Sequence, residues 1–198
     1  PSPNDGYDGP ILVVHKHSNP FSRYAAEILR AQGFNEFKVE EIEDVNAAML
    51  ADYDVVVLGE MSLSSTKVTD LTNWVTNGGT LIAFRPDMQL SSLMGITNAG
   101  GSVSDQYLLV NTASALGTGI VGETIQFHGT ADQYTLNTAT AVATLYSDAT
   151  TATTYPAVTI NSVGANGGKA IAFTYDLAKS IVLTRQGNPA WAGQNRDG

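Results

Sequence analysis

The chain has 198 residues, of which 43% are hydrophobic and 15% are charged, a composition typical of a folded protein with one substantial core. Ten Lys and Arg residues against 19 Asp and Glu residues give a net charge of −9, so the surface repels nucleic-acid phosphates. No Cys is present, which excludes disulfides, thiolate metal sites and thiol nucleophiles.

The first half of the chain alternates strand patterns with helix patterns. Short apolar or alternating runs predict strands over 11–14, 37–42, 54–59 and 80–84. Helical spacing and capping residues predict helices over 21–32, over 45–50 and from Ser64 or Ser65 to Gly78. A β-α-β-α-β-α-β order with short connections predicts a doubly wound, mostly parallel sheet with helices on both faces. The apolar runs are too short to insert in a membrane.

The second half is rich in Thr and poor in charge. Five short β-branched runs predict strands over 107–110, 124–127, 133–136, 141–146 and 157–160. We interpret residues 101–165 as an antiparallel insertion or extension packed on the first layer, with a separate β domain as the alternative. The strand pattern of 169–175 and the helix pattern through about Arg185 indicate a return to the parallel sheet. One domain is therefore expected over 1–198, with its core in about 10–100 and 165–186.

The ends and the composition bear on the protein's context. The chain begins Pro1-Ser2-Pro3 and ends at Gly198 without an evident capping element, so we expect a fragment of a larger protein. Absence of Cys with abundant Thr, Ser, Ala and Gly suits an exported bacterial protein, in the extracellular space or cell envelope. A cytoplasmic protein is the alternative.

Three segments together resemble a known superfamily. They are Tyr53–Gly59 with Leu63-Ser64, Trp74–Phe84 with its Gly78-Gly79-Thr80-Leu81 run, and Gly168–Leu177. About 10–95 and 165–185 resemble the class I glutamine amidotransferase-like superfamily, above all its ThuA-like domains and the middle domain of certain β-galactosidases. The resemblance implies a flavodoxin-like sheet. The whole chain, including 187–194, is also similar to the N-terminal region of large secreted bacterial proteins that carry a polysaccharide-deacetylase-like segment.

The sequence departs from this superfamily at the catalytic positions. The resemblance implies a Cys nucleophile in the turn that follows the strand 80–84, and a His after the last strand. Here the turn is Phe84-Arg85-Pro86-Asp87, and the last strand ends in Tyr175-Asp176-Leu177. No G-x-S-x-G motif replaces the thiol. Glutaminase chemistry by a thiol nucleophile is therefore excluded, and we assign neither catalytic residues nor a cofactor.

Polar residues nevertheless follow each of the predicted parallel strands, where ligands bind in open α/β sheets. The candidate ligand-binding residues are His17, Ser18, Asn19, Glu60, Arg85, Asp87 and Asp176. Structural roles compete with this hypothesis: Arg85 pairing with Asp87 or Glu60 and closing the pocket, and Asp176 capping the last helix. A metal site from His17, Glu60, Asp87 and Asp176 lacks a compact ligand motif, so no metal is assigned.

Three functions compete. The first is a non-catalytic accessory domain of a larger, exported, carbohydrate-related bacterial protein, whose partners are the other domains of the same polypeptide. The second is a module that binds a carbohydrate or small molecule at the strand ends, with residual non-thiol hydrolase activity. The third is an interaction domain that uses the β-rich extension, including self-association into a homo-oligomer.

Overall fold

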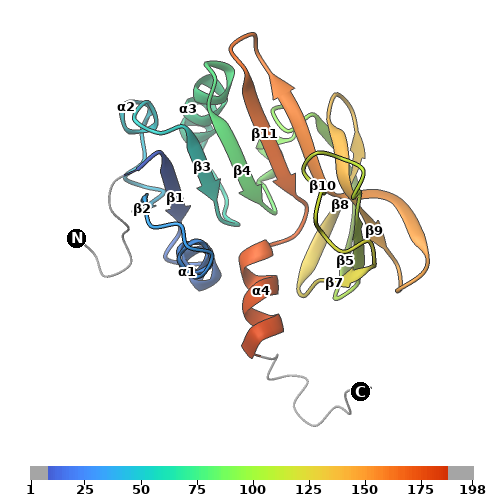
Figure 1. Cartoon of the computed structure of the whole chain (residues 1–198). Helices are drawn as coiled ribbons and strands as arrows, with labels where there is room; N and C mark the ends of the chain where they lie inside the picture. The colour runs from blue at the N-terminus through green and yellow to red at the C-terminus, as the bar shows by residue number, and fades with distance from the viewer. Residues whose placement is uncertain (1–8, 187–198) are drawn as a thin grey trace.

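A computed structural model describes residues 9–186 (Figure 1). The first eight and last twelve residues of the predicted domain, including 187–194, lie outside this range. The elements are β1 (Ile11–His15), η1 (Pro20–Arg23), α1 (Tyr24–Ala31), β2 (Phe37–Glu41), α2 (Ala47–Leu50), β3 (Val55–Leu58), α3 (Ser65–Thr76), β4 (Thr80–Phe84), η2 (Met88–Leu90), β5 (Ile96–Ser104), β6 (Tyr107–Val110), β7 (Ile125–Gln126), β8 (Thr130–Leu136), β9 (Thr140–Tyr146), β10 (Ala152–Val163), β11 (Gly168–Phe173) and α4 (Leu177–Gln186).

Nine strands form one mixed sheet in the order β2-β1-β3-β4-β11-β10-β9-β6-β7. The first five are parallel, as the repeated strand-then-helix pattern predicts. β11 pairs with β4 in register from Lys169 with Thr80 to Phe173 with Phe84, so the last strand rejoins the parallel sheet as expected. Their carboxyl ends lie along the lower edge of the sheet in Figure 1.

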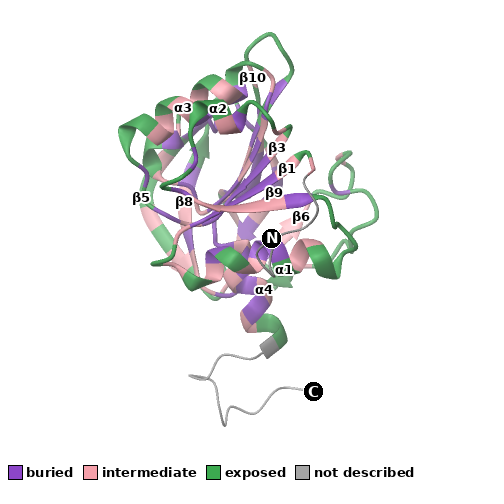
Figure 2. Ribbon diagram, turned by 90° about the vertical axis from the view of Figure 1, so that its left-hand side faces the viewer, coloured by how far each residue is buried: buried purple, intermediate pink, exposed green. Residues whose placement is uncertain are grey.

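The two faces of the parallel strands bury different side chains, because successive residues of a strand point to opposite faces. On one face, Leu12, Val56 and Leu81 pack against α3. The helix contributes Leu71 and Val75 to this part of the core. On the other face, Val13, Val57 and Phe84 pack with the Ala residues of α1 and with Ala178 of α4. Helices therefore cover both faces, and their outer surfaces are exposed while the strands between them are buried (Figure 2). The structure is mixed α/β.

The antiparallel strands extend the same sheet. β10 pairs with β11, β9 with β10, and β6 with β9, so these strands lie beside the parallel part rather than on top of it as a second layer. Only β5 and β8 form a separate two-stranded ribbon among the described residues. The antiparallel part begins at Ile96, earlier than the predicted residue 101. The run Thr97–Val103 contains Gly and Asn and has no alternating apolar pattern, but it forms a strand because it pairs with β8.

Capping residues shift two predicted helix starts. Asn46 accepts hydrogen bonds from the backbone N–H groups of Ala48 and Met49, so α2 begins at Ala47 rather than at Val45. Asn19 accepts one from Phe21, and the predicted helix 21–32 starts as the 3₁₀ turn η1 before α1. Ser64 caps α3 through Lys67, as predicted. Among residues 9–186, no helix is long and apolar enough to span a membrane.

Candidate functional site

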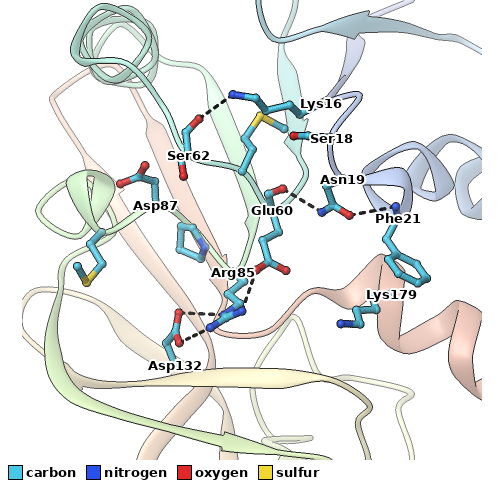
Figure 3. Close-up of a pocket in the computed structure, with 13 residues that line it drawn as sticks. Lys16, Ser18, Asn19, Phe21, Glu60, Ser62, Arg85, Asp87, Asp132 and Lys179 are labelled. Atoms are coloured by element: carbon cyan, nitrogen blue, oxygen red, sulfur yellow. Dashed lines mark hydrogen bonds and ion pairs between the residues drawn. The ribbon is translucent and has the colours of Figure 1, made fainter. Parts of the chain in front are cut away.

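An open cleft of about 750 Å³ lies at the carboxyl ends of the parallel strands, and we call it the rim cleft (Figure 3). It is lined by Lys16, Ser18, Asn19, Phe21, Glu60, Met61, Ser62, Arg85, Pro86, Asp87, Met88, Asp132 and Lys179. Five of the seven predicted site residues are among these: Ser18, Asn19, Glu60, Arg85 and Asp87. The chain therefore brings together side chains from β1, β3, β4, β8 and α4 or the turns that follow them.

Arg85 occupies the centre of the rim cleft from the turn after β4. Its φ of 40° lies in the left-handed region, which is costly for a residue with a Cβ. The turn is held because the Arg85 N–H donates to the carbonyls of Phe173 and Tyr175, at 2.8 and 3.2 Å. The backbone thus anchors β4 to the end of β11 and aims the guanidinium across the cleft.

The guanidinium of Arg85 is bound by two carboxylates. Its Nε and Nη2 donate to the two carboxylate oxygens of Asp132, at 3.1 and 2.9 Å, and its Nη1 donates to Oε1 of Glu60 at 2.8 Å. The sequence predicts a pair with Glu60 or Asp87; the structure shows pairs with Glu60 and Asp132. The bidentate contact with Asp132 fixes the orientation of both groups. This network joins the β5–β8 ribbon to the parallel sheet.

Burial and the ion pair with Arg85 shift the pKa of Glu60 in opposite directions. Burial raises the pKa of Glu60 above its usual range, and the positive charge of Arg85 opposes that rise. The hydrogen bonds that Arg85 donates to Asp132 raise the pKa of Arg85, which therefore stays protonated. The pKa of Glu60 is therefore raised even though its carboxylate is ion-paired with Arg85.

The other carboxylate and amide side chains of the rim cleft support its loops. Asp87 accepts from the backbone N–H groups of Leu63 and Gln89, at 2.8 and 2.9 Å, and caps η2. Asn19 caps η1 and donates to the carbonyl of Glu60 at 3.0 Å. Ser18 is exposed, and Lys179 lies over the ring of Phe21 at 5.6 Å from its centroid. Ser18 and Lys179 thus do not support the loops in this way.

Two predicted residues do not line the rim cleft. The His17 side chain is exposed, and its backbone N–H donates to Glu41. Asp176 is 3% exposed and caps α4, because its carboxylate accepts from the N–H of Lys179 at 3.1 Å. Within residues 9–186, no three or more His, Asp or Glu side chains are arranged to hold a metal ion.

Three charged lining residues are missing from the sequence prediction: Lys16, Asp132 and Lys179. Asp132 lies on β8, where neither spacing nor motif connects it to Arg85, 47 positions earlier in the chain. Lys16 directly precedes His17, and Lys179 lies one turn beyond Asp176, so both follow strands that the sequence pattern does identify. A wider window around the predicted strand ends would include them.

Replacing Asp176 with Asn is expected to stabilise the folded chain relative to the native protein, and this gain in unfolding free energy should be larger at pH 7 than at pH 4. Burial raises the pKa of Asp176, so the folded state binds its proton more tightly than the unfolded state, and native stability falls as pH rises through this pKa. Asn retains the capping oxygen without the buried charge. The measurement is urea unfolding of both proteins across this pH range.

The advantage of the Asn variant should disappear below the unfolded pKa of Asp, about 3.9, where the carboxyl group is neutral in both the folded and the unfolded state. The exposed Asp52→Asn substitution is the matched control. If the stability difference between Asp176→Asn and the native protein did not change with pH, Asp176 would not have a raised pKa in the folded state.

Comparisons with known proteins concern the fold. No family model and no curated protein sequence matches this chain. A β-galactosidase from Bacillus circulans sp. alkalophilus is similar with a TM-score of 0.66 and 13% identity, over 90% of this chain and 31% of that one. An exo-β-1,4-mannosidase from Opitutaceae bacterium strain TAV5 gives 0.65 and 14%, over 93% of this chain and 34% of that one.

A further neighbour has nearly the same length. The N-terminal domain of mmIFT52 is similar over 95% of this chain and 99% of that one, with a TM-score of 0.62 and 12% identity. This chain spans about a third of the length of the two glycosidases. At these identities the comparisons establish a shared fold.

Proposed function

We propose that this chain is a non-catalytic accessory domain of a larger, exported, carbohydrate-related protein, and that its fold is of the flavodoxin-like, amidotransferase-like kind. The parallel strands run in the order β2-β1-β3-β4-β11, which is the flavodoxin order when β11 counts as the fifth strand. Two glycosidases that contain this fold as about a third of their chains support the carbohydrate context.

One observation carries the proposal. The turn after β4, where the superfamily's nucleophile is expected, is strained in the way that a nucleophile elbow is, with φ 40°. It presents the guanidinium of Arg85, which Glu60 and Asp132 hold in place. The strained geometry of this turn therefore serves a structural role, because it places Arg85 in the ion-pair network. A guanidinium is not a nucleophile, so the turn does not present one at this position.

The accessory role needs a surface for neighbouring domains. The stretch between β6 and the end of β7 exposes four large apolar side chains, Leu116, Ile120, Val121 and Ile125, with Val121 56% exposed. Ile125 lies on β7, the edge strand of the sheet, and the other three residues lie in the loop that leads into β7. Apolar groups gathered at an edge favour contact with another domain of the same polypeptide or with a second copy.

The test is an assay of the purified chain with glutamine, p-nitrophenyl acetate and p-nitrophenyl β-galactoside. We expect no turnover above that of an identically purified Arg85→Met variant. Turnover that persists through purification and is lost when Ser18 is replaced with Ala would defeat the accessory role, because it would place a nucleophile in the rim cleft.

A second candidate function is ligand binding in the rim cleft, favoured by the position of this cleft at the strand ends and by the two polar groups that do not support its loops, Ser18 and Lys179. Galactosides and mannosides are the probes that the glycosidase neighbours suggest. Saturation-transfer NMR with lactose should lose its signal in Ser18→Ala/Lys179→Ala if this candidate holds. The exposed Lys169→Ala substitution on β11 serves as the control.

A further inference from the structure

A second cleft, of about 580 Å³, lies at the opposite end of the parallel sheet and is lined by residues of α2 and α3. Figure 1 shows these two helices at the upper edge of the sheet. We call this cleft the α3 cleft. Its walls come from α3, from the residues that precede β3 and β4, and from Asn166 in the turn between β10 and β11. These positions are at the amino ends of the strands, so the α3 cleft shares no lining residue with the rim cleft.

One stripe of α3 forms the main wall. Asp70, Asn73, Trp74 and Asn77 follow the spacing i, i+3, i+4, i+7 and therefore lie on one side of the helix. The adjacent stripe, which contains Leu71 and Val75, is buried in the core. The helix thus turns a polar stripe with one aromatic ring toward the α3 cleft, in addition to the apolar stripe that holds it on the sheet.

The Trp74 ring is held rigidly at the edge of the core. Its Nε1–H donates to the carbonyl of Tyr53 at 3.3 Å. The ring lies against Gly79, where a Cβ would come within 2.4 Å of the indole. Trp74 is half-buried, packs on the core and lines the α3 cleft.

The amide and carboxylate side chains of the α3 cleft do not bond to one another. Asn73, Asn77 and Asn166 are exposed, and none of their side-chain amides bonds to another residue within 9–186. The same holds for the carboxylates of Asp54 and Asp70 among the described residues. By contrast, the carboxylates and the guanidinium of the rim cleft bind each other. The α3 cleft therefore keeps its hydrogen-bonding capacity for a ligand.

From these features we infer that the α3 cleft binds a neutral saccharide, with the sugar ring against Trp74 and its hydroxyls on the Asn and Asp side chains. Each hydroxyl donates one hydrogen bond and accepts two, and amides with carboxylates supply both kinds of partner. A flat indole matches the C–H face of a pyranose ring. The described lining residues include no Lys, Arg or His, which disfavours phosphates and other anions.

The chain's two Trp residues make the test simple, because a Trp191→Phe variant leaves Trp74 as the only indole. The fluorescence of this 198-residue variant is titrated with D-galactose, D-mannose and cellotetraose. We expect a saturable change with at least one probe below about 10 mM. Adding Asn73→Ala and Asn77→Ala should weaken that binding about tenfold or more, because two hydrogen bonds are lost.

Arg185→Ala, at an exposed position of α4 that lines neither cleft, is the control and should leave the titration unchanged. Circular dichroism confirms that the Asn double variant is folded, and the side-chain amide resonances of Asn166 report binding independently of Trp74. No saturable change with any probe, or equal affinity in the Asn double variant, would overturn the inference. A saturable response to CaCl₂ alone, with none to the sugars, would reassign the α3 cleft to a divalent cation.

Discussion

Replacing Arg85 with Ala is expected to lower the free energy of unfolding by about 2–4 kcal/mol. The substitution leaves the carboxylates of Glu60 and Asp132 facing each other across the rim cleft without their shared cation. Loss of one partner from a fully buried pair costs more, but the Glu60 and Asp132 side chains are 32% and 22% exposed, so water screens part of the repulsion. Urea unfolding of the whole chain at pH 7 measures the difference.

Two further substitutions separate the charge from the backbone strain. Arg185→Ala removes an exposed guanidinium at the end of α4 and should change stability by less than about 0.5 kcal/mol. Arg85→Gly should be about 1 kcal/mol more stable than Arg85→Ala, because Gly adopts the φ of 40° without strain. If Arg85→Ala matched the native protein, the three-residue network would contribute nothing to stability, and the structural role assigned to Arg85 would fail.

Replacing Gly168 with Ala should cost about 2–4 kcal/mol of unfolding free energy, through overpacking. A Cβ at this position would lie 1.9 Å from the backbone carbonyl oxygen of Val75 and 2.9 Å from that of Val163. Neither atom belongs to a flexible side chain, so β11 and the end of α3 must move apart. Differential scanning calorimetry should show a lower melting temperature, and circular dichroism an unchanged secondary-structure content.

Gly122→Ala provides the matched comparison, because its Cβ would meet only the Thr112 methyl carbon at 3.9 Å. This variant should lie within about 0.5 kcal/mol of the native protein. Equal stability of the Gly168 and Gly122 variants would mean that β11 does not pack as closely on α3 as the structure indicates.

Local pattern is sufficient for the parallel half of the fold. The runs at Leu12–Val14, Val55–Leu58 and Leu81–Phe84 are apolar at every position because both faces of a covered parallel strand are buried. Ser64 and Asp176 are recognisable as caps because a short polar side chain before an apolar helix pattern bonds the free N–H groups of its own first turn. Such interactions join residues close in sequence, so spacing reveals them.

The antiparallel half is less accessible, for the opposite reason. Pairing of β5 with β8 joins Ile96 to Leu136, and the Gly-, Asn- and Ser-rich strand between Ile96 and Ser104 has no alternating pattern of its own. Its strand character comes from its partner. The main sheet likewise gains β10 by its pairing with β11, and β9 by its pairing with β10, and no local property of those runs encodes these pairings.

At the rim cleft, composition and strand ends by themselves indicate Ser18, Asn19, Glu60, Arg85 and Asp87, and the absence of Cys and of a late His excludes thiol chemistry. Only the tertiary structure decided what those groups do. Asp132 arrives from β8 to bind Arg85, Asp87 turns to its own loop, and Asp176 is buried under the helix it caps. An ion pair depends on distance in space, which a linear pattern does not record once the partners are separated by several strands.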